Sequence, residues 1–198
     1  MNLYIDTATS SWWQFPRGGK PADDSLQPYL VRLAWLLENP DGTTVREVSH
    51  LIKLPLGERM AHEAAHHLGI YDHNLQERGM AMFSVLTEFG DALGEAKVVV
   101  AHSWAFHRQV LERSFRHVGM PARVWPTNIC TMIRSTDIVC IPKQQRGGGN
   151  KWPSMDETCD RFLGRRLMPS MDPVADGIER VRAVRVFLSN IRRHQEAS

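Results

Sequence analysis

The chain begins with a short apolar run that ends in an acid, Leu3-Tyr4-Ile5-Asp6-Thr7. Such a run predicts a buried strand, and the Asp6 carboxylate at its end is expected to meet solvent, where it can bind a metal ion or cap a turn. A second acid two residues later would lie on the same side of the strand. Position 8 is alanine, however, so this strand offers one carboxylate where a two-metal site would use two.

Length and composition predict one folded domain over residues 1–198. Hydrophobic residues make up 42% of the chain and charged residues 23%, a balance typical of a soluble globular protein. No apolar stretch reaches the roughly 18 residues that a bilayer crossing needs, and no charged segment precedes the apolar N-terminus as in a signal peptide. Cys130, Cys140 and Cys159 lack the paired spacing of a disulfide framework or a zinc site. We therefore expect a cytoplasmic protein with no membrane partner.

The net charge of +2 is too small to indicate a nucleic-acid-binding protein by itself. Its distribution is uneven, because residues 161–198 hold eight arginines against four acidic residues. A run of this kind is typical of a solvated helix face, and contact with nucleic acid is the alternative.

The order of apolar segments and turn residues predicts alternating strands and helices. Strands are expected over 29–38 and 45–53, joined by a turn at 39–42, and over 97–101, parallel to the first strand. Helices are expected over 62–68, through 83–93 with Gly94 as the stop, over 106–118, after a capping box at Ser154 and Glu157, and over 176–193. This order indicates an α/β layer fold with a mixed sheet.

Four motifs occur in an order and at a spacing that together are specific. They are Ile5-Asp6-Thr7-Ala8-Thr9, Glu63-Ala64-Ala65-His66-His67-Leu68-Gly69-Ile70, Val99-Val100-Ala101-His102-Ser103-Trp104-Ala105-Phe106-His107 and Met171-Asp172-Pro173-Val174-Ala175-Asp176. Together they resemble the motifs of the DEDDh 3′–5′ exonucleases, the DnaQ-like family of polymerase proofreading subunits. The resemblance covers nearly the whole chain, and it is closest to small members carried by phages and mobile elements.

This resemblance implies a ribonuclease H-like fold, with a mixed five-stranded sheet flanked by helices. It also implies a site in which four carboxylates hold two Mg²⁺ or Mn²⁺ ions about 4 Å apart, with a histidine as general base. The family acts on the 3′ ends of DNA or RNA, so single-stranded nucleic acid is the partner that the resemblance implies.

Carried over position by position, the resemblance predicts a damaged site. Asp6 is retained, but Ala8 replaces the glutamate of the first motif, His107 replaces the aspartate of the second, and Met171 replaces the general-base histidine. Two carboxylates, Asp6 and Asp176, cannot offset two divalent cations, and Mg²⁺ prefers oxygen to a neutral imidazole. Metal binding is therefore expected to be weak or absent, and loss of the base alone costs about 10²- to 10⁴-fold in rate.

The position of the last acid depends on the alignment. It falls on Asp176 when the third motif is aligned without a gap from Gly164, and on Glu179 when the alignment slides by three residues. We prefer Asp176, because Asp172 and Ala175 also agree with the family motif in that register. An engineered change could account for Ala8 but not for the other two replacements.

Four residues near these motifs are candidates for contact with nucleic acid: Thr7, Trp12, Trp13 and His102. The tryptophans occupy positions where the family places residues near the 3′ end of its substrate, which implies base stacking. A tryptophan pair that covers the edge of the sheet is an equal alternative. His102 is expected to bond to backbone and to position the loop that follows it.

Three functions remain open from the sequence. The first is an inactive pseudo-exonuclease that binds nucleic acid or serves as an accessory subunit of a nucleoprotein complex. The second is an active or impaired metal-dependent 3′–5′ exonuclease. The third is a protein-interaction module or inhibitor that binds no nucleic acid. The missing acids and the missing base favour the first.

Overall fold

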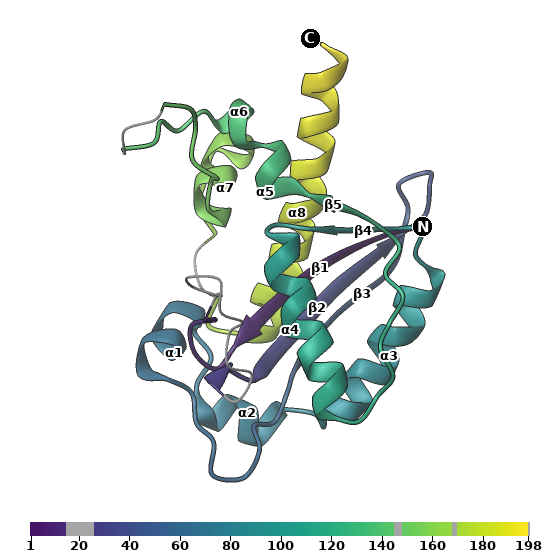
Figure 1. Ribbon diagram of the computed structural model, residues 1–198, viewed down its shortest axis with the longest axis vertical. Coiled ribbons are helices and arrows are strands. Elements are labelled where there is room, and N and C mark those ends of the chain that lie inside the picture. Colours follow the sequence, from purple (N-terminus) through teal and green to yellow (C-terminus); the bar gives the residue numbers. More distant parts are fainter. Residues whose placement is uncertain (15–25, 145–147, 168–169, 198) are drawn as a thin grey trace.

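A computed structural model describes residues 1–14, 26–144, 148–167 and 170–197 of the chain. Figure 1 shows a five-stranded sheet made of β1 (Asn2–Thr9), β2 (Leu30–Glu38), β3 (Thr44–Leu51), β4 (Val98–Ala101) and β5 (Thr127–Cys130). The strand order is β3-β2-β1-β4-β5. β1 pairs antiparallel with β2 and parallel with β4, so the strand that carries Asp6 lies at the centre of the sheet. The expected mixed five-stranded sheet is confirmed.

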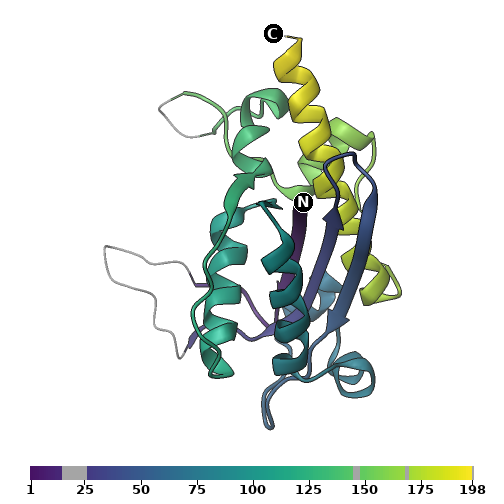
Figure 2. The same ribbon diagram turned by 90° about the vertical axis from the view of Figure 1, so that its right-hand side faces the viewer.

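Helices cover both faces of this sheet, as the two views in Figures 1 and 2 show. One face packs against α3 (Met82–Glu95) and α4 (Trp104–His117), and the other against α8 (Pro173–Glu196). The remaining helices are α1 (His62–Leu68), α2 (Asp72–Arg78), α5 (Thr131–Arg134), α6 (Thr136–Val139) and α7 (Met155–Leu163). Among the described residues, no helix combines the length and hydropathy that a membrane crossing requires.

The alternation of side chains along β1 decides which residues face which helix layer. Leu3 and Ile5 belong to the core under α3 and α4, whereas Tyr4 packs under α8 with Val181 and Val184. Successive side chains of a strand point to opposite faces, so Asp6 projects on the α8 side. The strand thereby brings its only acid under the first turn of the C-terminal helix.

Several local expectations are confirmed and two need correction. The capping box of Ser154 and Glu157 is present at the start of α7. The expectation that Gly94 stops a helix is wrong, because α3 continues to Glu95. The C-terminal helix begins earlier than expected, at Pro173, because the Asp172 carboxylate accepts a hydrogen bond from the Val174 N–H at 3.0 Å and caps it. Helix α2 and strand β5 are not among the elements that the sequence predicts individually.

α8 approaches the sheet most closely at Gly177. A Cβ atom at this position would collide with the Ser49 hydroxyl oxygen and would lie 3.1 Å from both the Ala34 Cβ and the Arg32 Cδ. The absence of a side chain at Gly177 therefore allows the helix to lie against β2 and β3 beside the acidic site.

We expect Gly177→Ala to lower the free energy of unfolding by about 1 to 3 kcal/mol, because the added methyl group must push α8 away from the sheet. Gly94→Ala is the matched control, since Gly94 lies within α3 and a Cβ there meets nothing within 4 Å. That control should gain about 0.5 to 1 kcal/mol from helix propensity. Urea denaturation of both variants measures the difference in their free energies of unfolding. Equal changes in the two variants would contradict the close approach of α8 to the sheet at Gly177.

Candidate functional site

Two acids from distant parts of the chain meet at one buried arginine. Arg32 on β2 donates from Nη2 to the Asp6 Oδ2 at 3.2 Å and from Nη1 to the Asp176 Oδ2 at 2.5 Å. The same Nη1 also donates to the Pro173 carbonyl oxygen at 3.1 Å. Arg32 is fully buried, and Asp6 and Asp176 are 5% and 1% exposed. Asp176, and not Glu179, therefore shares this arginine with Asp6.

The register of the sheet explains how Arg32 reaches this position. Ala8 of β1 lies directly opposite Arg32 of β2, and Asp6 lies opposite Ala34. Directly opposite residues of an antiparallel pair project from the same face, and diagonal neighbours remain within reach of a long side chain. The small Ala8 side chain thus leaves room for Arg32, which extends diagonally to Asp6. Ala8, at the position where the family motif has a glutamate, therefore lies beside the arginine that binds both acids.

A second arginine completes the cluster. Arg180, one turn after Asp176 on α8, donates from Nε to the same Asp176 Oδ2 at 2.8 Å. Burial lowers the pKa of the Arg180 guanidinium, but the charges of Asp6 and Asp176 raise it by more, so its pKa lies above the usual value. The two carboxylates and two guanidinium groups together have a formal charge of zero.

Neither arginine of the cluster is predicted by the sequence analysis. Arg32 is a charged residue within a fully buried strand whose other residues, apart from the terminal Glu38, are apolar. A buried charge requires a counterion, and this requirement is the signal that points to a partner for Arg32. The expectation that the C-terminal arginines line a solvated helix face is wrong for Arg180, whose side chain is only 15% exposed.

His107, in place of the second-motif aspartate, is fully engaged in hydrogen bonds within the protein. The Thr7 N–H donates to its Nδ1 at 3.2 Å, so the proton must lie on Nε2, which donates to the His102 carbonyl oxygen at 2.8 Å. The Thr7 hydroxyl also lies 2.8 Å from Nδ1. Burial lowers the pKa of His107, with the nearby Asp6 charge opposing it, so the ring is neutral. It joins β1 to the start of α4, and neither nitrogen has a lone pair free for a metal ion.

His102 is also buried and bonded on both sides. Its Nε2 lies 3.1 Å from the Pro153 carbonyl oxygen, which can only accept, and its Nδ1 lies 3.1 Å from the Thr131 hydroxyl. Burial lowers the pKa of His102 to about 4, with the Pro153 bond opposing the shift. The ring therefore holds the segment before α7 against the start of α5, and in this position it does not reach a ligand at the surface.

The other three candidates for nucleic-acid contact differ in exposure. Thr7 is buried and bonds to His107. The Trp13 indole N–H donates to the Gln109 Oε1 at 3.2 Å, and the indole packs edge-on against the Phe106 ring. Trp12 is 54% exposed, and its ring centroid lies 5.2 Å from that of His67. Trp12 alone among the four therefore presents a largely exposed surface.

The third motif contributes one acid to the cluster and leaves its other positions outside it. Met171, in place of the general-base histidine, is fully exposed. Asp172 caps α8 and pairs with Arg78 at 2.9 Å, which together with its capping bond lowers its pKa. Glu179 pairs with Arg165 at 2.7 Å on the surface.

The side chains of this cluster do not fit a pair of divalent ions. At an effective dielectric constant of about 20, a divalent cation and a guanidinium group 4 Å apart repel each other by roughly 8 kcal/mol. Among the described residues, no three His, Cys, Asp or Glu side chains gather closely enough to hold a metal ion. A Mg²⁺ or Mn²⁺ ion would have to displace Arg32 from the two acids that it binds.

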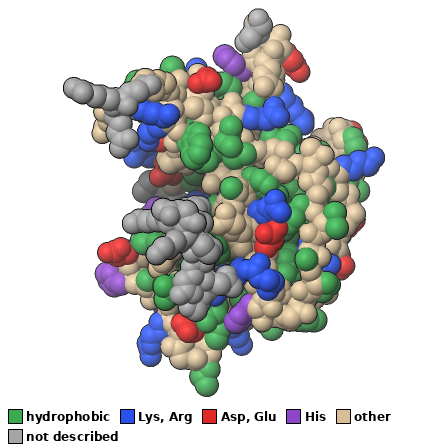
Figure 3. All heavy atoms as spheres, viewed as in Figure 1, with side chains coloured by type: hydrophobic (Ala, Val, Ile, Leu, Met, Phe, Trp, Pro, Cys, Tyr) green, Lys and Arg blue, Asp and Glu red, His purple; other side chains and the backbone are tan. Residues whose placement is uncertain are grey.

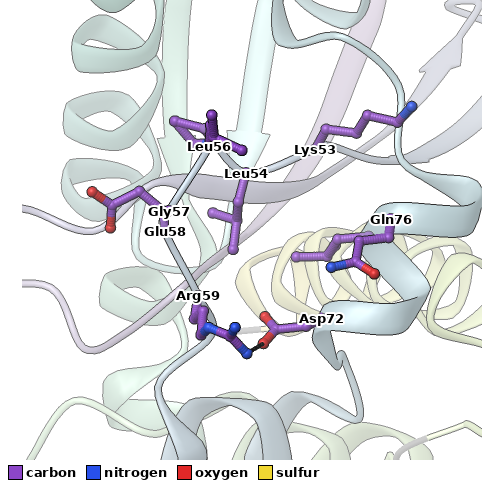
Figure 4. A pocket seen from close by; sticks show the side chains of 10 residues that line it. Lys53, Leu54, Leu56, Gly57, Glu58, Arg59, Asp72 and Gln76 are labelled. Carbon is purple, nitrogen blue, oxygen red and sulfur yellow. Dashed lines mark ion pairs between the residues drawn. The ribbon is translucent and has the colours of Figure 1, made fainter.

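One cavity borders the cluster, and a larger one lies elsewhere in the described part of the fold. A cavity of about 240 Å³ beside the cluster is lined by His67, Ser154, Met155, Asp156, Leu167 and Arg180. A larger one of about 540 Å³ lies between residues 53–59 and α2, where Arg59 and Asp72 approach to 3.9 Å (Figure 4). Neither Asp6 nor Asp176 lines either cavity, but Arg180 of the cluster lines the smaller one.

Comparison with known proteins identifies the fold. No family model and no curated protein matches the chain. Escherichia coli exonuclease I in complex with a dT13 oligonucleotide matches 99% of this chain with a TM-score of 0.71 and 9% identity, and this chain covers 42% of it. The chain has the exonuclease I fold. This match confirms the expected ribonuclease H-like, DnaQ-like architecture, and identity this low shows the fold alone.

Two further structures with the exonuclease I fold agree. Escherichia coli exonuclease I with a dA16 oligonucleotide matches 96% of this chain with a TM-score of 0.66 and 10% identity. This chain covers 40% of that protein. An ExoI/SSB-Ct complex matches 96% of this chain with a TM-score of 0.64 and 11% identity, and this chain covers 42% of the matched chain. This chain therefore spans less than half the length of the exonuclease I chains that it matches.

We expect Asp176→Asn to lower the free energy of unfolding by about 3 kcal/mol, because it leaves buried Arg32 short of a counterion. Glu179→Gln is the control, since it removes only a surface pair with Arg165, which is worth less than about 1 kcal/mol. Urea denaturation at neutral pH measures both. In a metal site, clustered carboxylates repel each other and removal of one stabilises the metal-free protein, so a stabilising Asp176→Asn would contradict the arginine-centred cluster.

Burial of His102 predicts that stability falls in mild acid. The imidazole of the unfolded chain takes up a proton near pH 6.5, whereas the folded ring stays neutral to about pH 4. The unfolded state then binds more protons between these values, so stability decreases by up to about 3 kcal/mol as the pH falls through this window. His102→Gln retains a donor and an acceptor but does not titrate.

The free energy of unfolding, measured from pH 7.5 to 4.5, should therefore decline less steeply for His102→Gln than for the parent. Parallel profiles would show that His102 is not the titrating group.

Proposed function

We propose that this chain is an exonuclease-fold protein that binds single-stranded nucleic acid without cleaving it, with its 198 residues acting as one domain. The observation that carries the proposal is the position of Arg32, whose guanidinium group lies between Asp6 and Asp176. A guanidinium group supplies positive charge at this point, but unlike a metal ion it does not lower the pKa of a bound water molecule to generate a nucleophile.

The replaced motif positions support the same proposal. Both ring nitrogens of His107 are used in bonds to Thr7 and to the His102 backbone, so this residue cannot take over the role of a carboxylate ligand. Met171 offers no base at the third motif. The chain thus lacks a general base and two of the four acids that phosphodiester hydrolysis uses in this fold.

Binding of nucleic acid is inferred from the neighbours and from one exposed ring. Exonuclease I was solved with dT13 and dA16 oligonucleotides, although this chain spans only 42% and 40% of those proteins. Trp12 is exposed and lies against His67, which lines the smaller cavity together with Arg180. A base stacked on Trp12 would place its phosphate near this cavity, and stacking on an aromatic ring tolerates any base.

In this role the chain holds a single strand itself or serves as an accessory subunit of a nucleoprotein complex. An impaired exonuclease that uses Asp6 and Asp176 with a weakly held Mg²⁺ or Mn²⁺ ion is the alternative within the same fold. A protein-interaction module or inhibitor is the alternative without nucleic acid. Digestion and binding assays separate the three.

We expect no metal-dependent shortening of a labelled oligo(dT) in Mg²⁺ or Mn²⁺, and binding of the same strand that weakens as salt is added. Electrophoresis follows the length, and fluorescence anisotropy follows the binding. Digestion that disappears in Asp6→Ala would establish the impaired exonuclease. If the strand is neither shortened nor bound at low salt, the interaction module is favoured and the proposal is wrong.

The contribution of Trp12 is measured in the same assay. Trp12→Ala should weaken binding roughly 5- to 150-fold, which corresponds to about 1 to 3 kcal/mol per stacked base. Phe83→Ala is the matched control, because Phe83 is 57% exposed but lies on α3. Equal affinities for the two variants would place the binding surface away from Trp12.

A further inference from the structure

A second surface of the molecule, outside the acidic cluster, combines cations with exposed apolar side chains. It comprises Ile133 and Arg134 of α5, Lys151 and Trp152 before α7, and Arg161 of α7, and we refer to it as the α5–α7 surface. Figure 3 shows Lys and Arg side chains on either side of a group of hydrophobic side chains in the upper part of this face, where α5 to α8 lie.

Hydrogen bonds hold these segments together in one unit. Asn150 donates to the Asp137 carboxylate at 3.1 Å, and the Lys151 N–H donates to the Ile141 carbonyl oxygen at 2.9 Å. Arg161 donates from Nε to the Ile138 carbonyl oxygen at 3.3 Å, which joins α7 to α6. Because Arg134 lies one turn before Ile138, the α5 and α7 cations belong to the same small region.

This region carries an excess of positive charge. Residues 131–166 contain seven Lys and Arg against four Asp and Glu, although the whole chain has a net charge of only +2. Glu157 pairs with Lys151 at 2.5 Å and Asp160 pairs with Arg166 at 3.0 Å. Neither Arg134 nor Arg161 forms an ion pair with an acid in the described part of the chain.

Two large apolar side chains lie exposed among these cations. Trp152 is 65% exposed and Ile133 is 56% exposed. The backbone under Trp152 is held in place, because the adjoining Pro153 carbonyl oxygen bonds to His102, which also contacts Thr131 at the start of α5. An exposed indole on a fixed backbone next to unpaired arginines is the combination that binds single strands, in which bases stack on rings and phosphates meet cations.

We propose that the α5–α7 surface binds the backbone of single-stranded nucleic acid, with Arg134 and Arg161 contacting phosphates and Trp152 stacking on a base. The inference rests on the proposed nucleic-acid-binding function and assigns it a surface outside the acidic cluster. The cluster has no excess positive charge, so the electrostatic attraction for a polyanion must come from other cations. The α5–α7 surface supplies them.

The test is the salt dependence of oligo(dT) binding by the full chain and by an Arg134→Glu/Arg161→Glu variant. Each lost phosphate contact reduces the slope of log K against log salt by about 0.7 for a single strand. The double variant should therefore have a slope shallower by about 1.4, and it should bind roughly tenfold more weakly at low salt. Circular dichroism and the urea midpoint verify that the variant is folded.

An Arg46→Glu/Arg59→Glu variant is the matched control, since it changes the net charge equally on other exposed positions. It should keep the parental slope. Trp152→Ala retains every charge, so it should weaken binding roughly fivefold or more while the slope stays unchanged.

The outcomes distinguish this inference from the proposed function. If the parent binds and both double variants bind equally well, the α5–α7 surface is not the interface, although the chain still binds nucleic acid. If the parent binds no oligonucleotide at low salt, the proposed function is wrong and this inference falls with it. A slope reduced equally in both double variants would show a general charge effect and would also overturn the assignment.

Discussion

The position of the acidic site depends on one buried ion-pair cluster, centred on the guanidinium group of Arg32. This group binds Asp6 on the central strand, Asp176 on α8 and the Pro173 carbonyl oxygen. A charge removed from water at this depth costs several kcal/mol unless its partners are held close by. The cluster therefore couples the middle of the sheet to the start of the long C-terminal helix.

Ala8 and His107, which replace acids of the family motifs, pack against or bond to neighbouring residues of the fold. Ala8 lies opposite Arg32 in the sheet, and its small side chain is compatible with the long one beside it. His107 joins Thr7 of β1 to the His102 carbonyl oxygen at the start of α4. In both places a side chain expected to bind metal is replaced by one that packs or bonds within the fold. The fold therefore accommodates Ala8 and His107 through its own packing and hydrogen bonds.

Charge neutralisation at the cluster also bears on where a ligand is attracted. Two carboxylates and two guanidinium groups cancel, so the cluster by itself draws neither divalent cations nor phosphates strongly. Residues 131–166 carry an excess of positive charge. Trp12 beside the smaller cavity and Trp152 on the α5–α7 surface are both exposed rings.

Local sequence was sufficient for the features that depend on neighbours along the chain. Apolar runs and turn residues indicated β1 to β4, the spacing of Ser154 and Glu157 indicated a helix start, and motif spacing indicated Asp6 and Asp176. The role of Arg32 could not be predicted in the same way, because its partners lie 26 and 144 positions away. Their meeting requires the β1–β2 register and the close approach of α8 at Gly177, and both arise only when the sheet and helix pack together.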